Sequence, residues 1–266
     1  MTITEFIRER EIRGRVTFTI DDVRKAVKLS DNTILNELQR QVARVRIQIP
    51  YRGFYVIIPP QYALKGIVPP TYYIHELMKK VGKPYYVCLL SAAEYYGAAH
   101  QRAMVTQVMT LPPRLKHSEM NNLLNWNYRQ AVPSELLLQK NVEMGVMLYS
   151  SAELTAVDLV QFASHVGGYQ RAATVLAELM ESVDINRICG VIPYTTTATI
   201  QRLGYLLEFV LEEQHKADEL HCLLKETNSK WKTILMDNGR EKKANGESKV
   251  SVVIPSGDLA IVDVMF

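Results

Sequence analysis

The side chains best suited to a chemical task lie in a basic stretch in the first third of the chain. From Leu38 to His75 there is no Asp or Glu, but there are five cationic residues, Arg40, Arg44, Arg46, Arg52 and Lys65. Guanidinium groups pair with phosphate oxygens and make two parallel hydrogen bonds to guanine O6 and N7. A cationic segment that holds no carboxylate therefore indicates contact with nucleic acid.

A predicted helix over residues 30–44 supplies further groups of this kind. At about 100° per residue, one side of that helix is apolar and the opposite side is polar. The apolar arc is predicted to hold Ile34, Leu35, Leu38 and Val42, and the polar side Thr33, Asn36, Arg40 and Arg44. Asn is suited to adenine and Thr to the thymine methyl group. Any soluble amphipathic helix has a polar outer face, but the lack of carboxylates here beyond Glu37 favours DNA contact.

The segments around this helix have the order of a winged helix-turn-helix. Capping boxes at Thr2–Glu5 and Thr19–Asp22 predict two helix starts, and Ser30 or Asp31 caps the third helix after a turn at residues 28–30. Residues 17–19 can form a short strand. Residues 44–60 are typical of a hairpin, whose predicted turn, residues 50–53, has glycine at its fourth position and carries Tyr51 and Arg52 at the tip.

Two sets of residues follow from this arrangement. The predicted inward positions of the first two helices are Ile3, Phe6, Ile7, Val23, Ala26 and Val27. The predicted DNA-contacting residues are Asn32, Thr33, Asn36, Arg40, Arg44, Arg46, Tyr51 and Arg52.

Beyond residue 62 the pattern predicts a larger mixed α/β region, so the whole chain is expected to be α+β. Predicted helices cover 71–81, 91–97, 150–167, 171–182 and 197–214, with Ser91–Glu94 and Ser150–Glu153 as capping boxes. Predicted strands cover 85–90, 104–111, 143–149, 231–236 and 250–254, and residues 238–249 have the composition of a loop.

Composition and charge narrow the class of protein. Hydrophobic residues make up 47% and charged residues 22% of the 266, as in ordinary globular proteins. Residues 1–60 hold eleven Lys or Arg and seven Asp or Glu, so the basic excess belongs to this part. No apolar run is long enough for a membrane span, and the first residues lack the apolar core of a signal peptide, so we expect a cytoplasmic protein. The three cysteines are expected to be reduced and mostly buried.

Residues for catalysis or metal binding are few. His75-Glu76 lacks the second histidine of an HExxH motif, and no phosphate-binding glycine loop or GxSxG sequence occurs. Glu94 and Asp158 are expected in surface or structural roles. We predict no enzyme, catalytic residue, metal or cofactor. Two alternatives stay open: a DNA-processing enzyme that a winged helix delivers to DNA, and a transcription factor whose larger domain senses a ligand.

Several segments in order resemble one family, the AbiEi-type antitoxins. The resemblance lies in SDNTILNELQRQVARVRIQIPYRGFYVIIPPQY, YYIHELMKKVGKPYYVCLLSAAEYYGAAHQ, SSAELTAVDLVQFASHVGGYQRAATVLAEL and QRLGYLLE. It covers most of the chain, while the last forty residues match loosely. The segment Ile47-Gln48-Ile49-Pro50 is less basic than the family's pattern before RGFY.

The resemblance implies an antitoxin of a type IV toxin–antitoxin system, which acts in abortive infection, a form of phage defence. It implies a winged-helix DNA-binding domain, residues 1–62, that represses transcription from the protein's own promoter, and a C-terminal antitoxin domain, residues 63–266, that counteracts a toxin of the nucleotidyltransferase fold. Because one such helix contacts too few base pairs to select one promoter, we expect two copies on an inverted repeat in double-stranded DNA.

Overall fold

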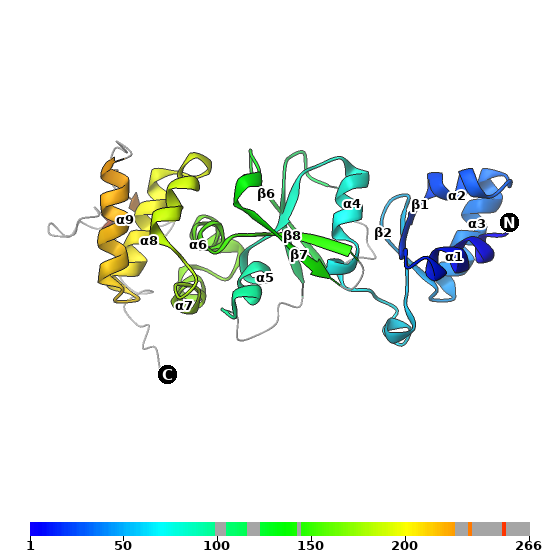
Figure 1. Ribbon diagram of the computed structural model, residues 1–266, viewed down its shortest axis with the longest axis horizontal. Coiled ribbons are helices and arrows are strands. Elements are labelled where there is room, and N and C mark those ends of the chain that lie inside the picture. Colours follow the sequence, from blue (N-terminus) through cyan, green and yellow to red (C-terminus); the bar gives the residue numbers. More distant parts are fainter. Residues whose placement is uncertain (99–104, 116–122, 143–144, 227–233, 236–251, 254–266) are drawn as a thin grey trace. The chain divides into compact units, whose positions relative to one another are not determined.

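The computed structural model describes residues 1–98, 105–115, 123–142, 145–226, 234–235 and 252–253 (Figure 1). The predicted terminal strands and the loop at 238–249 lie largely outside these residues. Two residues of each expected strand are described, β9 (Ile234–Leu235) and β10 (Val252–Val253), and they pair in parallel. The fold is mixed α+β, as predicted.

The N-terminal module, residues 1–58, has the order helix, strand, helix, helix, hairpin. Its elements are α1 (Ile3–Ile12), β1 (Thr17–Thr19), α2 (Ile20–Ala26), α3 (Asp31–Ala43), β2 (Ile47–Tyr51) and β3 (Phe54–Ile57). The three strands form one sheet in the order β1-β3-β2, and both pairings are antiparallel. The strand that precedes α2 therefore pairs with the outgoing strand of the hairpin.

Side-chain caps start all three helices where the sequence predicts. Thr2 and Glu5 form a complete capping box at α1, and Thr19 and Asp22 form another at α2. Ser30 caps α3, where its hydroxyl accepts a hydrogen bond from the backbone N–H of Thr33. Each cap satisfies backbone donors that the first helical turn leaves without partners.

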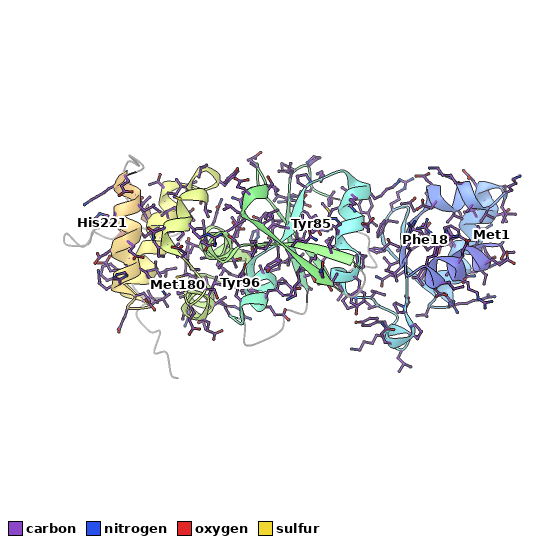
Figure 2. The ribbon with its side chains drawn as sticks, in the orientation of Figure 1. Met1, Phe18, Tyr85, Tyr96, Met180 and His221 are labelled. Atoms are coloured by element: carbon purple, nitrogen blue, oxygen red, sulfur yellow. The ribbon has the colours of Figure 1, made fainter. Side chains whose placement is uncertain are left out.

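The core of the module forms where the three helices meet the sheet. Phe18 of β1 lies at its centre, edge to face with Phe6 and stacked on Tyr55 (Figure 2). The predicted inward residues of α1 and α2 belong to this core: Ile3, Phe6, Ile7, Val23 and Val27 are buried, and Ala26 packs against them.

Two details of the predicted module are wrong. Leu35 is 42% exposed, and Gln41 takes the third buried position of α3 beside Ile34 and Leu38. Leu35 lies at the edge of the apolar arc, whereas the amide of Gln41 donates hydrogen bonds to Thr4 and Glu37. In the hairpin, strand β2 continues to Tyr51, so Gly53 is the third turn residue, with φ of +72°.

A five-stranded sheet forms the middle of the chain. Its strands are β4 (Tyr85–Val87), β5 (Thr106–Thr110), β6 (Leu124–Tyr128), β7 (Leu137–Val142) and β8 (Gly145–Ser150), and their order is β6-β5-β4-β8-β7. β5 and β6 are parallel neighbours, as are β4 and β8. β6 and β7 had no predicted counterpart because they do not combine an apolar run with clear turn signals.

The remaining α-helices of the described residues are α4 (Ile74–Val81), α5 (Leu89–Ala93), α6 (Ala152–Gln161), α7 (Tyr169–Leu179), α8 (Thr197–Phe209) and α9 (Gln214–Glu226). Short 3-10 helices lie at Pro60–Tyr62, Pro70–Tyr72, Glu94–Tyr96, Ser134–Leu136, Ala163–His165, Ile185–Gly190 and Ile192–Tyr194. α6 is buried along most of its length and packs against α5, α7 and α8.

Some predicted boundaries in this region need correction. The strand predicted at 85–90 ends at Val87, and α5 begins at Leu89, so Ser91 lies inside this helix and not at its N-cap, which is Cys88. Ser151, rather than Ser150, caps α6. The helix predicted at 197–214 is two helices, α8 and α9. Where apolar residues lie on both sides of a turn, the hydrophobic pattern continues across it and does not indicate where the turn is.

The chain divides into two compact units. The first holds residues 1–86, 104–132 and 139–148, and the second holds 87–103, 133–138 and 149–266. The first unit contains the N-terminal module, α4 and most of the sheet. The boundary predicted at residues 62 and 63 falls inside this unit and stays a prediction.

Candidate nucleic-acid interface

The polar residues predicted on α3 share one exposed face. Asn32, Thr33, Asn36 and Arg40 are exposed on the helix, and Arg44, also exposed, is its C-terminal cap residue. The burial of Ile34, Leu38 and Gln41 on the opposite side fixes this orientation. The Thr33 hydroxyl lies 2.8 Å from the hydroxyl of Ser30 and is thus held at the first turn.

The four predicted arginines differ in their partners. Arg40 donates a hydrogen bond to Glu37 at 3.1 Å, and Arg46 lies 3.4 Å from a carboxylate oxygen of Glu11. The exposed side chains of Arg44 and Arg52 make no hydrogen bond or ion pair within the described ranges. Arg44 and Arg52 are therefore more readily available for phosphate than the two paired arginines.

The hairpin separates the remaining predicted residues. Arg46 precedes β2, whereas half-buried Tyr51 and exposed Arg52 lie at the turn after it. At about 3.3 Å per residue, the Cα atoms of Arg46 and Arg52 are roughly 20 Å apart. The eight predicted residues thus form one group on α3 and two smaller groups at opposite ends of β2.

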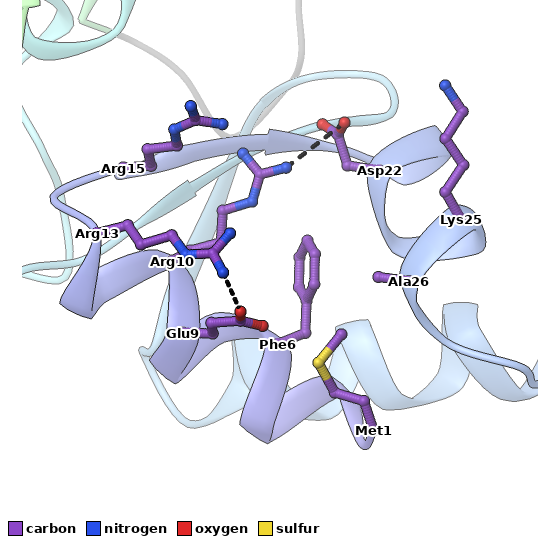
Figure 3. A pocket seen from close by; sticks show the side chains of 9 residues that line it. All are labelled: Met1, Phe6, Glu9, Arg10, Arg13, Arg15, Asp22, Lys25 and Ala26. Carbon is purple, nitrogen blue, oxygen red and sulfur yellow. Dashed lines mark hydrogen bonds and ion pairs between the residues drawn. The ribbon is translucent and has the colours of Figure 1, made fainter.

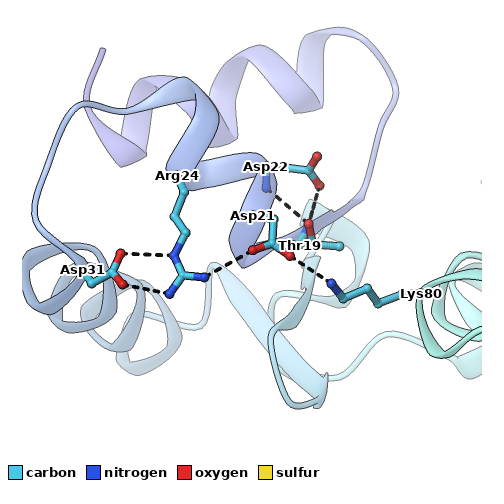
Figure 4. Close-up of polar contacts among 6 residues, drawn as sticks. All are labelled: Thr19, Asp21, Asp22, Arg24, Asp31 and Lys80. Atoms are coloured by element: carbon cyan, nitrogen blue, oxygen red, sulfur yellow. Dashed lines mark hydrogen bonds and ion pairs between the residues drawn. The ribbon is translucent and has the colours of Figure 1, made fainter.

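A chain of four charged residues connects α2 to its neighbours (Figure 4). The guanidinium of Arg24 makes two hydrogen bonds to Asp31, the first residue of α3, at 3.1 and 2.9 Å. The same group donates to Asp21 at 3.2 Å, and Asp21 in turn accepts from Lys80 of α4 at 3.0 Å. This alternation links the start of α3 to α4 through α2.

These contacts change the acidity of the groups involved. Hydrogen bonds from Lys80 and Arg24 lower the pKa of Asp21. Burial raises the pKa of Asp22, but hydrogen bonds from the Thr19 backbone and hydroxyl outweigh burial and hold it below its ordinary value. Asp31 and Asp21 raise the pKa of Arg24. All these groups are charged at neutral pH, so the chain of charges is intact there.

The structure also places basic residues together that sequence patterns did not single out. Arg10, Arg13, Arg15 and Lys25 line one cavity formed by α1, the segment after it and α2. Arg10 lies on α1, Arg13 and Arg15 lie between α1 and β1, and Lys25 lies on α2, ten residues after Arg15. The charge count of residues 1–60 includes them, but only the tertiary structure brings them together.

A second cavity, of about 770 Å³, lies where α3 ends. Its lining combines apolar residues, among them Val45, Ile58 and Pro59, with the charged residues Glu11, Arg44 and Arg46. Val45 has φ of +56°, a left-handed conformation that β-branched residues rarely adopt. Val45 thus lies between Arg44, which ends the helix, and Arg46, which precedes the first strand of the hairpin.

Outside the N-terminal module, several residues considered in the sequence analysis for chemical roles are buried or paired. Glu153 and Asp158 are both buried on α6, so the surface role considered for Asp158 is wrong. His75 contacts the Tyr85 hydroxyl at 3.2 Å, and burial lowers the pKa of His75. Cys88 is buried, whereas Cys189 and Cys222 are exposed, contrary to the expectation that most are buried.

The described residues hold neither a cluster suited to a metal ion nor a helix suited to a membrane. No group of three or more His, Cys, Asp or Glu side chains there is arranged to hold a metal ion. No helix in those ranges has both the length and the apolar character that crossing a membrane requires.

Comparison with known proteins gives a family match in the middle of the chain. The family model described as the AbiEi antitoxin C-terminal domain matches residues 85–209. This match confirms the resemblance to AbiEi-type antitoxins over those residues. A search among curated proteins gave no match.

One solved structure is similar over nearly the whole chain. It is the crystal structure of the RV2827C protein from Mycobacterium tuberculosis, with a TM-score of 0.67 over 94% of this chain and 90% of that one. Sequence identity is 14%, so the likeness shows a shared fold and carries no statement about function.

Proposed function

We propose that the protein is the antitoxin of a type IV toxin–antitoxin system, because residues 85–209 match the family model of the AbiEi antitoxin C-terminal domain. In this proposal it binds its own promoter as a transcriptional autorepressor and counteracts a toxin of the nucleotidyltransferase fold. The domain supports the antitoxin role. Autorepression and the kind of toxin rest on the family resemblance together with the features of the N-terminal module.

The observation that carries DNA binding is the exposed face of α3. We infer that residues 1–58 are a winged helix-turn-helix in which α2 and α3 are the two helices and β2–β3 the wing. The strand order β1-β3-β2 and the short turn between α2 and α3 support this assignment. Asn32, Thr33, Asn36 and Arg40 then face the major groove, and Arg44 and Arg52 lie where they can contact phosphates.

One α3 helix contacts too few base pairs to distinguish a single promoter from the rest of a genome. We therefore propose that two copies bind an inverted repeat. If the copies contact each other on one face of the DNA, the half-sites are separated by roughly 10 base pairs or a multiple. Scrambling the second half-site should then weaken binding to the first, and a footprint that is indifferent to this change would argue against two copies.

A mobility-shift titration of the full chain on its own promoter tests DNA binding. The variant Arg40→Ala/Arg44→Ala/Arg46→Ala/Arg52→Ala should lose promoter binding, and single changes at phosphate contacts should each reduce the salt slope by about one. A matched fourfold variant at Arg171, Lys225, Arg187 and Arg202, all outside the N-terminal module, controls for the loss of charge. Unaltered promoter binding by the first variant contradicts the assignment.

A ligand-sensing transcription factor is a second candidate, because the cavity beside Arg44 and Arg46 combines apolar walls with a few charged groups. A ligand there would act directly on the end of α3. Metabolites that raise the melting temperature of the wild type, but not of Val45→Trp, and that also change promoter affinity would favour this candidate. The DNA-processing alternative has no comparable observation in its support.

A further inference from the structure

The cavity between α1, the segment after it and α2 is a basic notch, which we define by Arg10, Arg13, Arg15 and Lys25 (Figure 3). Its volume is about 260 Å³, and its lining also includes the carboxylates of Glu9 and Asp22. Four cationic groups against two anionic ones leave a positive charge in this notch. No residue of α3 lines it, so it is separate from the face described above.

Two of the four cations are neutralised within the notch. Arg10 lies 3.5 Å from Asp22, donates a hydrogen bond to the Thr17 carbonyl at 3.2 Å and covers the ring of Phe6. The side chain of Arg10 is 19% exposed, and these contacts hold it in place as the floor of the notch. Arg13 pairs with Glu9. These contacts account for both carboxylates of the lining.

Arg15 and Lys25 are the remaining cations. Both are exposed, and in the part of the chain that the structure describes neither side chain makes a hydrogen bond or a close ion pair; the charge of Lys25 contributes to lowering the pKa of Asp22. Figure 3 shows them on the two sides of the Arg10–Asp22 pair. Two exposed cationic side chains that flank a rigid, paired floor and are not held by hydrogen bonds are suited to a bound anion.

The surroundings favour a long anion over a small one. A neighbouring cavity of about 640 Å³ shares Arg10, Arg15 and Asp22 with the notch and adds Lys79 and Lys80 of α4, which pair with Glu76 and Asp21. Because Arg15 lines both cavities, together they suit a chain of phosphates better than a single phosphate group. Phe6, the aromatic ring of the notch, is 5% exposed, so no ring face is open to stack on a base.

We propose that the basic notch binds the sugar–phosphate backbone of DNA outside the base pairs that α3 contacts. This inference rests on the proposed function, because it assumes that the N-terminal module binds DNA. Contacts with phosphate add affinity and carry no direct sequence information. Arg15 and Lys25 therefore strengthen binding to any duplex, and the choice of sequence stays with α3.

Fluorescence anisotropy with the full chain tests the inference. Wild type, Arg15→Ala/Lys25→Ala and Arg8→Ala are titrated with a promoter duplex and with a scrambled duplex of equal length, from about 50 to about 200 mM salt. Arg8 is an exposed arginine of α1 outside the notch and is the matched control. Melting curves verify that all three proteins are folded.

The double variant should bind both duplexes more weakly by the same factor, at least about tenfold near 100 mM salt, and its salt slope should be smaller by about two. Arg8→Ala should match the wild type. A double variant whose affinity and slope equal those of Arg8→Ala overturns the inference. If instead the wild type does not prefer the promoter duplex, the proposed function fails, whatever the notch does.

Calorimetric titration with inorganic pyrophosphate distinguishes DNA from a free anion. Under the inference, pyrophosphate binds the wild type no more tightly than it binds the double variant. Saturable binding that the double variant loses, together with an unchanged salt slope for DNA, would assign the notch to a small phosphate compound and contradict a role in DNA binding.

Discussion

At the scale of single residues, Glu37 is the carboxylate on the face of α3 expected to meet DNA. It accepts hydrogen bonds from Arg40 at 3.1 Å and from the buried Gln41 at 3.4 Å. An anionic group beside phosphates weakens binding, and its pairing with Arg40 holds that guanidinium on the protein. In the proposed function, Glu37 should therefore limit the affinity of α3 for DNA.

We predict that Glu37→Gln raises promoter affinity up to about eightfold near 0.1 M salt and increases the salt slope by about one, because an anionic group is removed and the guanidinium of Arg40, released from Glu37, can also reach a phosphate at the edge of the major groove. The measurement is the mobility-shift titration described above. Glu181→Gln, a change at an exposed carboxylate of the helical region, should have no effect. A loss of affinity in Glu37→Gln would mean that the pair positions Arg40 productively.

In the hairpin turn, we expect Gly53 to affect the stability of the protein and the adjacent Arg52 to affect its affinity for DNA. Gly53 has φ of +72°, and a β-carbon there costs about 1 kcal/mol through backbone strain. Gly53→Ala should thus lower the melting temperature by a few degrees. Arg52→Ala should leave the melting temperature unchanged and lower DNA affinity. Differential scanning calorimetry beside anisotropy compares them, and a reversed pattern would argue against this division.

At the scale of elements, we expect the capping box at α2 to contribute to the stability of the N-terminal module and to the dependence of that stability on pH. The Thr19 hydroxyl accepts from the Asp22 backbone N–H at 3.2 Å, and the Thr19 backbone N–H donates to the Asp22 carboxylate at 2.8 Å. Thr19→Ala should cost about 1 kcal/mol of unfolding free energy. Chemical denaturation measures it, with Thr174→Ala, an exposed helical threonine of α7, as the control.

The pH dependence follows from the same contacts. Folding lowers the pKa values of Asp21 and Asp22, so the stability that they supply is fully present above their unfolded value of about 3.8. That stability is lost as pH falls through the lower, folded-state values. The N-terminal module should therefore unfold more readily below about pH 4. Asp22→Asn should reduce this dependence, and an equally steep decline in that variant would exclude Asp22 as its source.

At the scale of the whole molecule, the proposed functions of repression and neutralisation are assigned to different parts of the chain. Contacts within the first unit join the N-terminal module to residues beyond 62. Gln48 exchanges two hydrogen bonds with the backbone of Val68, and Phe54 lies near Tyr73. A cut at 62 and 63 removes these contacts, although the N-terminal core formed by α1, α2, α3 and the hairpin is complete before residue 60.

We predict that residues 63–266 alone neutralise the toxin, because the AbiEi antitoxin domain match lies at 85–209 and the basic excess lies in residues 1–60. In the full chain, Arg40→Ala should abolish repression and spare neutralisation. Colony growth on co-expression of the toxin scores neutralisation, and a promoter fusion scores repression. Cell death in the presence of a 63–266 fragment that is folded by circular dichroism would contradict this division.

Much of the N-terminal module could be predicted from sequence because its signals are local. Thr2, Thr19 and Ser30 cap helices through contacts within three residues, and the periodicity of Ile34 and Leu38 defines the buried side of α3. The sequence alone thus determined the helix starts, the polar face of α3 and the family resemblance. Each of these depends on neighbours along the chain or on residue order.

Only the tertiary structure decided which charged groups meet. Arg24 is bound to Asp31 and Asp21, and Arg15 and Lys25 share one notch, although no spacing rule relates these residues. The burial of Gln41 in place of Leu35 depends on Thr4 of α1, thirty-seven residues away. Such contacts form when helices and strands pack together. The energy of each contact depends on the distance between its atoms, and the order of residues along the chain does not give that distance.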